Sequence, residues 1–339
     1  MHFQLPTAPV GPVSLRRLPA TATRRGVTLV EMMVVVAIIA ALMALVSTAV
    51  GAARESARRN SCSNNLRQVV MGLHRHVASN SAFPAGNTYS GITPSSLNNT
   101  WCNSNGTGLM PWTVAVLPYI EQENLFDRFN PNLTFMTNSF DPPPNVNGSS
   151  QVQVPLPVLQ CPSSSLWENP MRNNYFGVQG SAPVGCTEGP SPNGTRSFYL
   201  NGMMFVNSRV GFGHVRDGLS HVFVLGETNM SMLCLNTASG RREFFRWTLG
   251  GKPGSVGSPL PMPMQLAGMD LPLNSWRFSP LASIMLQQGT RGFGSDHPGG
   301  VYFALADGSV QFISEYADFN VLKLLSGRRD GGLLQDAVQ

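Results

Sequence analysis

Residues 24–31 read RRGVTLVE, and residues 32–46 continue as MMVVVAIIAALMALV, a run without a single polar side chain. Between Val27 and Val50 the only charged side chain is that of Glu31. At a rise of 1.5 Å per residue, a helix over 27–50 would be about 36 Å long, and the hydrocarbon core of a bilayer is about 30 Å thick. The sequence therefore predicts a membrane-spanning helix over residues 27–50.

Three kinds of N-terminus would carry such a run. A cleaved signal peptide has an apolar stretch of about 7–15 residues, which is shorter than this one. An uncleaved signal anchor fits the length but gives no reason for Glu31, since a carboxylate in the membrane costs about 2.5–3.5 kcal/mol on insertion scales. A charged residue in this setting is functional by default. A third kind of N-terminus, described next, gives Glu31 a function.

The stretch resembles the type IV prepilin signature, in which a peptidase cuts after a glycine and leaves glutamate at the fifth mature position. The resemblance implies a leader over 1–26, a cut between Gly26 and Val27, and a prepilin peptidase as partner. Val27 stands where the family usually has phenylalanine. The cut would free an α-ammonium, with a pKa near 8. Glu31 of a neighbouring subunit would neutralise that ammonium and so set the register between subunits.

The helix is expected to continue beyond the membrane as an amphipathic segment over 51–80. Its apolar positions recur at spacings of three and four residues, which places them on one face of a helix. These positions are Cys62, Leu66, Val69, Val70, Leu73 and Val77. Pro84 and Gly86 end the pattern. His74 and His76 face different sides of this helix, so we interpret them as surface or capping groups and not as joint metal ligands.

The composition of the chain indicates that a turn-rich domain outside the cytoplasm follows this helix. Charged residues make up only 12% of the chain, and it contains 34 glycines and 26 prolines. The arginines cluster on both flanks of the apolar run, as beside a membrane segment, so no nucleic-acid partner is expected. The five cysteines form no CxxC pair. In an oxidising compartment they would make up to two disulfides, and the sequence does not determine which cysteines pair. Alternatively, they serve as small buried apolar residues.

Residues 81–339 are predicted to form a β-rich domain. Trp112–Tyr119 is expected to be buried, Ile120–Phe129 to form a short helix, and Val158–Ser163 to be a strand entering a turn. Val222–Leu225 reads as a strand that is apolar on both faces. Ala306-Asp307-Gly308-Ser309 separates two β-rich runs, and Asp-Gly in that position is a strong hairpin signal because glycine accepts positive φ. The fold class is therefore α+β and pilin-like, with a long N-terminal helix packed on an antiparallel β-rich domain.

A second resemblance covers nearly the whole chain. An ordered series of short motifs is similar to DUF1559, a large bacterial family of prepilin-like, planctomycete-type proteins with a C-terminal H-x9-DG motif. The series is Arg54–Arg59 with Cys62, Leu117–Gln122, Cys161-Pro162-Ser163, Asp217–Ser220 with Gly226-Glu227, and His297–Gly300 with Asp307-Gly308. The H-x9-DG motif would occupy 297–308. Two positions depart from the family pattern: this chain has Leu219 where the family often has Thr, and His221 where the family often has Asn. The resemblance implies a type II secretion pseudopilin-like fold with surface or periplasmic exposure.

Four polar residues are candidates for a ligand site: His297, Asp307, Asp217 and Glu227. A calcium site would need six to eight oxygens from closely set groups, and no D-x-D-x-D-G run occurs. We expect instead that the aspartates form turns, that His297 hydrogen-bonds the hairpin, and that no metal or cofactor is bound. No G-x-S-x-G, H-E-x-x-H, P-loop or GxGxxG-after-strand pattern is present, so we do not expect an enzyme.

Two functions of different classes remain open. The first is a membrane-anchored structural subunit of a type II secretion or type IV pilus-like assembly. It would cross the cytoplasmic (inner) membrane once and hold its C-terminal domain on the periplasmic or extracellular side. The second is a tethered receptor that never polymerises and grips a solute or glycan with loops over 87–102 and 138–150. A weaker third hypothesis is an extracytoplasmic hydrolase that uses His297.

Overall fold

The structure, a computed structural model, describes most of the chain from Gly26 onward. The described residues are 26–89, 108–130, 133, 135, 154–164, 170–181, 183–186, 196–228, 232–236, 241–244, 247–248, 251–252, 262–263, 265–275 and 292–329. The predicted leader over 1–26 lies outside them except for Gly26. The chain divides into two compact units, residues 1–52 and 53–339.

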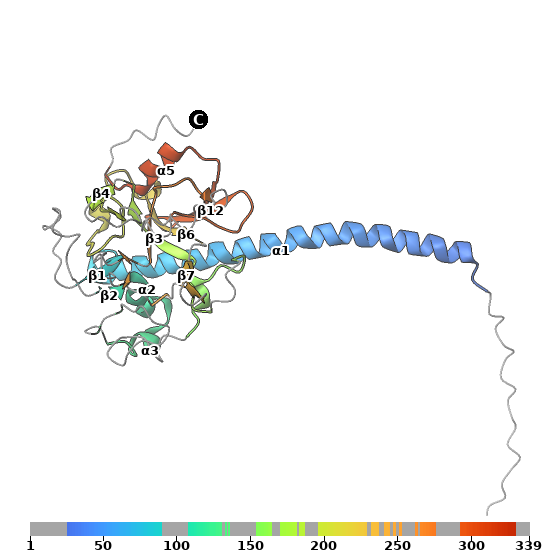
Figure 1. Cartoon of the computed structure of the whole chain (residues 1–339), viewed down its shortest axis with the longest axis horizontal. Coiled ribbons are helices and arrows are strands. Elements are labelled where there is room, and N and C mark those ends of the chain that lie inside the picture. Colours follow the sequence, from blue (N-terminus) through green and yellow to red (C-terminus); the bar gives the residue numbers. More distant parts are fainter. Residues whose placement is uncertain are drawn as a thin grey trace, which may run out of the picture. The chain divides into compact units, whose positions relative to one another are not determined.

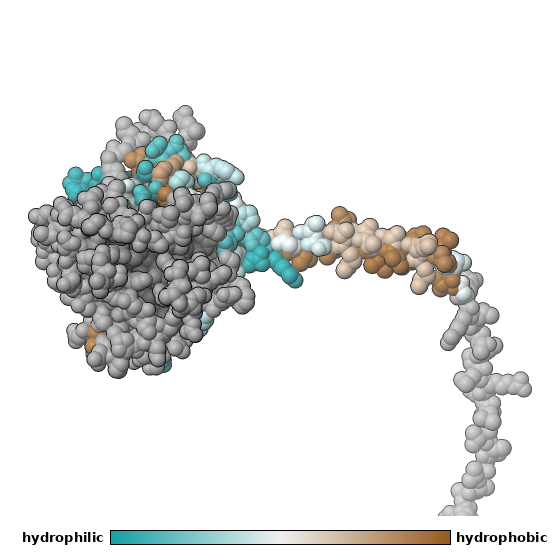
Figure 2. Space-filling view, viewed as in Figure 1, coloured by the Kyte–Doolittle hydropathy of each residue, from teal (hydrophilic) through white to brown (hydrophobic). Residues whose placement is uncertain are grey.

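The first described element is α1, Leu29–Asn80, a helix of 52 residues. Its N-terminal part, which belongs to the first unit, exposes a continuous series of large apolar side chains from Leu29 to Val50. The brown surface in Figure 2 follows this segment. Within the described residues, α1 is the one helix long and apolar enough to cross a membrane. Apolar side chains exposed over such a length require an environment other than water.

A five-stranded sheet forms the centre of the second unit (Figure 1). Its strands, in spatial order, are β11 (Leu266–Gly268), β3 (Tyr175–Gly180), β6 (Phe223–Glu227), β12 (Gly300–Leu305) and β13 (Val310–Ser314). β11 pairs parallel with β3, and the other neighbours pair antiparallel. The register places Tyr175 opposite Glu227. Every residue of β3 and β6 is buried, so both faces of the sheet must be covered.

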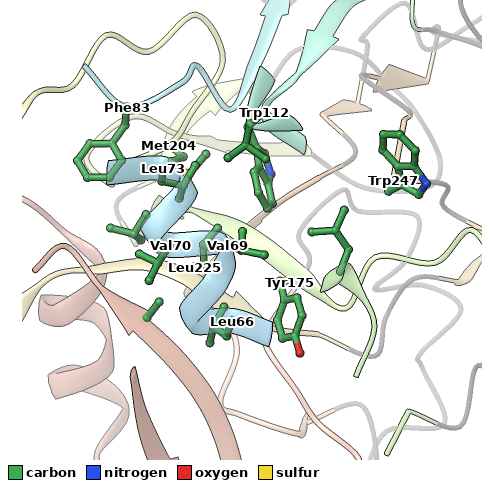
Figure 3. Close-up of a cluster of buried hydrophobic side chains, with 14 of the residues drawn as sticks. Leu66, Val69, Val70, Leu73, Phe83, Trp112, Tyr175, Met204, Leu225 and Trp247 are labelled. Carbon is green, nitrogen blue, oxygen red and sulfur yellow. The ribbon is translucent and has the colours of Figure 1, made fainter. Parts of the chain in front are cut away.

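The C-terminal part of α1 covers one face of this sheet. The six positions of the predicted apolar stripe are all buried, which confirms the amphipathic continuation. Figure 3 shows Leu66, Val69, Val70 and Leu73 packed in one cluster with Tyr175, Leu225 and other buried side chains. Each aliphatic side chain buried in this way stabilises the fold by about 1.5–3 kcal/mol.

The opposite face carries a second core. Phe176, Phe223 and Phe303 alternate with the residues that face α1, as the pleat of a strand requires. The short C-terminal helix α5, Phe319–Ser326, contributes Leu322 to this core. The sheet is therefore sandwiched between α1 and α5. The predicted α+β class is confirmed, and the arrangement is consistent with a pilin-like fold.

Shorter elements surround this sandwich. They are β1 (Asn87–Tyr89), β2 (Gly108–Pro111), α2 (Trp112–Ala115), η3 (Leu117–Ile120), α3 (Glu123–Phe126), η4 (Pro157–Leu159), β4 (Pro183–Cys186), β5 (Arg196–Tyr199), η5 (Phe212–His214), η6 (Leu219–His221), β7 (Met232–Asn236), β8 (Arg241–Phe244), β9 (Gly251–Lys252) and β10 (Met262–Pro263). The strands pair antiparallel as β1–β2, β4–β5, β7–β8 and β9–β10.

The predicted hairpin is confirmed. β12 and β13 pair antiparallel across the Asp307-Gly308 turn, where Gly308 has a φ of +90°. The carboxylate of Asp307 accepts hydrogen bonds from the backbone N–H and the hydroxyl of Ser309, at 2.8 and 2.7 Å. These contacts explain both turn residues locally, because the positive φ favours glycine and the short acidic side chain closes the turn.

Two local predictions were wrong in extent or type. Helix α3 covers only Glu123–Phe126 of the predicted Ile120–Phe129, because Glu121 adopts a left-handed φ of +63° and interrupts the segment. Residues 158–163 do not form a strand. Pro157 begins a short 3-10 helix instead, closed by a bond from Leu159 N–H to the carbonyl of Leu156.

The two histidines of α1 differ in role. The ring of His76 lies 2.9 Å from the carbonyl of Ala82, just beyond the end of the helix, which fits the predicted capping role. His74 is half-buried, like His76. Its ring packs edge-on against Phe83 and Phe212, and its Nε2 lies 3.0 Å from the carbonyl of Ala306.

Candidate functional site

The first candidate site is the N-terminus of α1, where Gly26, Val27 and Glu31 lie. Gly26 and Val27 are exposed and precede the helix. A side chain at position 26 would meet no atom within 4 Å, so nothing in the described structure requires glycine there. A requirement for glycine at this position must therefore come from outside the fold, for example from a peptidase.

Glu31 has a contact that the sequence analysis missed. Its Oε2 accepts hydrogen bonds from Thr28 N–H at 2.8 Å and from the Thr28 hydroxyl at 2.9 Å, and Glu31 N–H donates to Thr28 Oγ1 at 3.3 Å. This reciprocal pair is a capping box. The T-x-x-E pattern before an apolar run was the signal that would have predicted it. Glu31 Oε1 accepts no hydrogen bond from the described residues.

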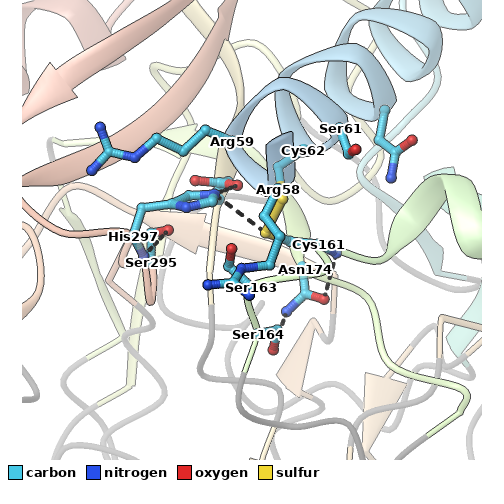
Figure 4. The surroundings of a disulfide bond; sticks show 12 residues. Arg58, Arg59, Ser61, Cys62, Cys161, Ser163, Ser164, Asn174, Ser295 and His297 are labelled. Atoms are coloured by element: carbon cyan, nitrogen blue, oxygen red, sulfur yellow. Dashed lines mark hydrogen bonds and ion pairs between the residues drawn. A yellow bond between two sulfur atoms is a disulfide. The ribbon is translucent and has the colours of Figure 1, made fainter. Parts of the chain in front are cut away.

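The second candidate site lies in the second unit, where α1 meets the sheet. Cys62 of α1 forms a disulfide with Cys161, which follows η4. The ring of His297 points at this disulfide, with Nε2 3.4 Å from Cys161 Sγ (Figure 4). Glu227, the last residue of β6, lies beside the same ring, with Oε1 3.6 Å from Nε2. Sulfur, imidazole and carboxylate groups from four segments therefore meet at one buried point.

Glu55 of α1 completes the surroundings of His297. Its Oε1 lies 2.8 Å from His297 Nδ1, and its Oε2 pairs with Arg58 Nη2 at 2.8 Å. His297 is fully buried, whereas the Glu55 side chain is 22% exposed. Glu55 therefore bridges the buried imidazole and the arginines on the surface of α1.

These carboxylates shift the titration of the imidazole. Burial alone would lower the pKa of His297, but the facing carboxylates of Glu227 and Glu55 outweigh it and raise the pKa. For Glu55, burial acts to raise the pKa, but the partners His297 and Arg58 outweigh it and leave the pKa below its ordinary value.

The structure separates the residues of the H-x9-DG motif. His297 is buried beside the disulfide, whereas Asp307 is exposed in the β12–β13 turn and Gly308 lies next to His74. The expectation that His297 hydrogen-bonds the hairpin was wrong, because its ring nitrogens face Glu55 and Cys161. Its contact with β12 is an edge-on packing against Tyr302. The sequence could not show this, because Glu55 and His297 are 242 positions apart.

Part of the motif series converges here instead. Glu55, Cys62, Cys161, Glu227 and His297 each belong to a different quoted motif or half-motif, and all lie around the same disulfide. Residues 51–320 match the family model described as protein of unknown function, DUF1559. The chain belongs to the DUF1559 family. Residues 21–47 match the prokaryotic N-terminal methylation motif.

The second match bears on the first candidate site. A methylation motif over 21–47 includes Gly26, Val27 and Glu31, and it indicates prepilin-like processing of this DUF1559 protein. Together with the apolar part of α1, it indicates a pilin-like protein anchored in the membrane by a single helix among the described residues. No curated protein and no solved structure matches the chain.

Proposed function

We propose that this DUF1559 protein is a non-enzymatic structural subunit of a type II secretion or type IV pilus-like assembly. A prepilin peptidase cuts it after Gly26. The mature chain begins at Val27, crosses the cytoplasmic membrane once over 27–50, and holds its β-rich domain on the periplasmic or extracellular side. The observation that carries the proposal is the match of residues 21–47 to the N-terminal methylation motif.

The charge at Glu31 supports this role. After the cut, the α-ammonium of Val27 adds to the positive end of the helix dipole, so a carboxylate nearby is favourable. Glu31 uses only Oε2 for the capping box, which leaves Oε1 for a further donor. The ammonium of a neighbouring subunit is such a donor. In the membrane, the pair stabilises both charges and determines how adjacent helices align.

Processing is tested by Gly26→Lys in a host that expresses a prepilin peptidase. The wild-type protein should begin at Val27, and the variant should keep residues 1–26, as N-terminal sequencing of membrane-extracted protein would show. Gly51→Ala is the matched control, because positions 26 and 51 both have open space around the added carbon. If wild-type and Gly26→Lys proteins begin at the same residue, cutting after Gly26 is ruled out.

Assembly is tested by comparing Glu31→Gln with Glu31→Ala. Glutamine retains a capping box but lacks the charge, whereas alanine loses both. Loss of the cap costs about 0.5–2 kcal/mol, and removal of one partner from a buried charge pair costs about 3–5 kcal/mol. Chemical cross-linking in membranes should therefore show that both variants lose oligomers to a similar degree.

The alternative outcome has a clear meaning. If Glu31→Gln assembles like wild type and only Glu31→Ala fails, Glu31 acts as a helix cap alone. If neither variant changes a monomeric wild-type protein, the tethered receptor becomes the better description. Of the loops assigned to that receptor, residues 90–102 and 138–150 lie outside the described residues.

A further inference from the structure

His297 and three buried groups around it have the composition of a metal site. The Sγ atoms of Cys62 and Cys161, one carboxylate oxygen of Glu227 and one ring nitrogen of His297 all lie within 4.8 Å of one another. In a tetrahedral zinc site with bonds of about 2.0–2.3 Å, the ligand atoms are about 3.3–3.8 Å apart. Small side-chain rotations, together with separation of the two sulfurs on reduction, would bring the four atoms to these distances.

The disulfide alone does not account for this arrangement. Glu227 is 2% exposed, yet its Oε1 has no hydrogen-bond partner among the described residues. His297 Nε2 lies 3.6 Å from this oxygen, which is beyond hydrogen-bond length. An unsatisfied buried polar group costs about 1–3 kcal/mol, and a charged one costs more. A disulfide between two cysteines needs neither this carboxylate nor the imidazole.

We propose that Cys62, Cys161, Glu227 and His297 form a tetrahedral site for a divalent ion of the zinc class when the two cysteines are reduced. The disulfide and the metal are then two alternative cross-links between α1 and the segment after η4. Thiolate, imidazole and carboxylate are the ligand types that zinc takes in proteins. The proposal departs from the sequence-based expectation that no metal is bound.

Hydrogen bonds around the four groups support this assignment. Glu55 lies 2.8 Å from His297 Nδ1, which directs Nε2 toward the sulfurs, as in the carboxylate–histidine–zinc arrangement. Tyr302 N–H donates to Glu227 Oε2 at 3.0 Å, so the other oxygen, Oε1, faces the site. Cys161 N–H donates to Asn174 Oδ1 at 3.0 Å and fixes the backbone beside the sulfur.

The charges also fit. Two thiolates, one carboxylate and a divalent cation leave a single negative charge, while His297 binds as a neutral ligand. Arg58 and Arg59 lie beside Glu55, at 2.8 and 3.6 Å from its oxygens, and partly offset that charge. A small cavity lined by Cys161, Asn174, Glu227 and neighbouring residues borders the site.

The disulfide is converted to the metal-binding state by a balanced reduction. A water-soluble phosphine donates two electrons to the S–S bond, takes up the oxygen of one water molecule and leaves as phosphine oxide. The two protons of that water protonate the two sulfurs. Each thiol then releases its proton when it binds the metal ion.

The test uses full-length protein in detergent, purified with its disulfide intact and then reduced by phosphine under anaerobic conditions. Co²⁺ is added as a spectroscopic probe, and Zn²⁺ is counted by elemental analysis after desalting. We expect one ion per chain, with a thiolate-to-cobalt charge-transfer band and the intense visible bands of a tetrahedral centre. The matched control replaces Cys102, Cys186 and Cys234 by serine and should bind equally well.

Three variants locate the ligands. Cys62→Ser with Cys161→Ser should abolish the charge-transfer band, and Glu227→Gln should weaken zinc binding at least tenfold. Glu55→Gln should weaken it about 10–100-fold, as loss of an outer hydrogen bond to a ligand does. Glu227→Gln and Glu55→Gln can be folded with the disulfide formed and checked by circular dichroism before reduction.

Two results would overturn the proposal. One is that reduced, folded wild-type protein binds less than about one tenth of an ion per chain. The other is that Glu227→Gln binds zinc as tightly as wild type and shows the same cobalt spectrum. Neither result bears on cleavage after Gly26, so the proposal fails or stands independently of the proposed function.

Discussion

Opening the Cys62–Cys161 cross-link should strongly destabilise the second unit. The disulfide closes a loop with a sequence separation of 99 residues. In the chain-entropy treatment, a ring of about 100 residues restricts the unfolded chain by about 4.7 kcal/mol at 25 °C, and natural disulfides contribute about 2–5 kcal/mol when strain and residual structure are included. We expect the free energy of unfolding to fall by an amount in this range when the protein is reduced and all metal is chelated.

The measurement is urea denaturation of full-length protein in detergent, followed by tryptophan fluorescence. Trp112 and Trp247 are completely buried, so their emission reports on the core of the second unit. Three samples are compared: oxidised, reduced with chelator, and reduced with Zn²⁺. With a denaturant slope of about 3 kcal/mol/M, a loss of about 2–5 kcal/mol moves the midpoint by about 0.7–1.7 M. Zinc should restore part of that shift, because the metal closes the same loop.

Reduction retains both sulfur atoms in the core, which makes it a cleaner perturbation than replacing the cysteines. The reasoning is refuted if the oxidised and the reduced, chelated samples have midpoints within about 0.3 M of each other. Such a result would show that the disulfide does not stabilise the part of the protein whose unfolding changes the tryptophan fluorescence. A shift that zinc leaves unchanged would count against the metal site but not against the loop-closure argument.

Three further perturbations have defined outcomes. Tyr175→Phe removes a buried hydroxyl that donates to the Cys62 carbonyl at 3.0 Å, so the free energy of unfolding should fall by about 1–1.5 kcal/mol in urea denaturation. Gly226→Ala places a methyl carbon 2.5 Å from atoms of two buried phenylalanine rings, and overpacking of this kind should cost about 1–3 kcal/mol by the same assay. Burial lowers the pKa of His76, so the unfolded chain takes up a proton that the folded chain resists, and the contribution of His76 to stability should decline as the pH falls below about 6.5. His76→Asn, which keeps an N–H donor for the Ala82 carbonyl, should lose that part of the decline when urea midpoints are compared at pH 7.5, 6.5 and 5.5.

Each of these perturbations has a control or a contrary result. Tyr316→Phe changes a side chain that is 88% exposed and should alter stability by less than about 0.5 kcal/mol. Gly213→Ala adds a carbon that meets nothing within 4 Å and should be similarly mild. If either control is as costly as its buried counterpart, the packing argument is wrong. If wild type and His76→Asn show parallel pH profiles, His76 does not contribute to the acid sensitivity.

Short-range patterns predicted the elements whose causes lie within a few residues. The stripe from Cys62 to Val77 repeats with the helical period, so the buried face of α1 followed from spacing alone. The Asp307-Gly308 hairpin followed from the conformations that those two residues accept. The Thr28–Glu31 capping box is equally local, because its two side chains are three positions apart.

Long-range pairing was not predictable by the same route. Nothing in the spacing of five cysteines selects Cys62 with Cys161, because the choice depends on how η4 packs against α1. Likewise, His297 and Asp307 look like one motif in the sequence, yet the strand between them carries the aspartate away to the hairpin turn.

By itself, then, the sequence determined the apolar anchor, the processing motif at Gly26 and the amphipathic face of α1, because each depends on neighbours within one or two helical turns. Only the tertiary structure decided that Glu55, Cys62, Cys161, Glu227 and His297 share one buried point. Their side chains meet because β6, β12 and α1 pack around a common core, and that packing depends on contacts between residues far apart in the chain.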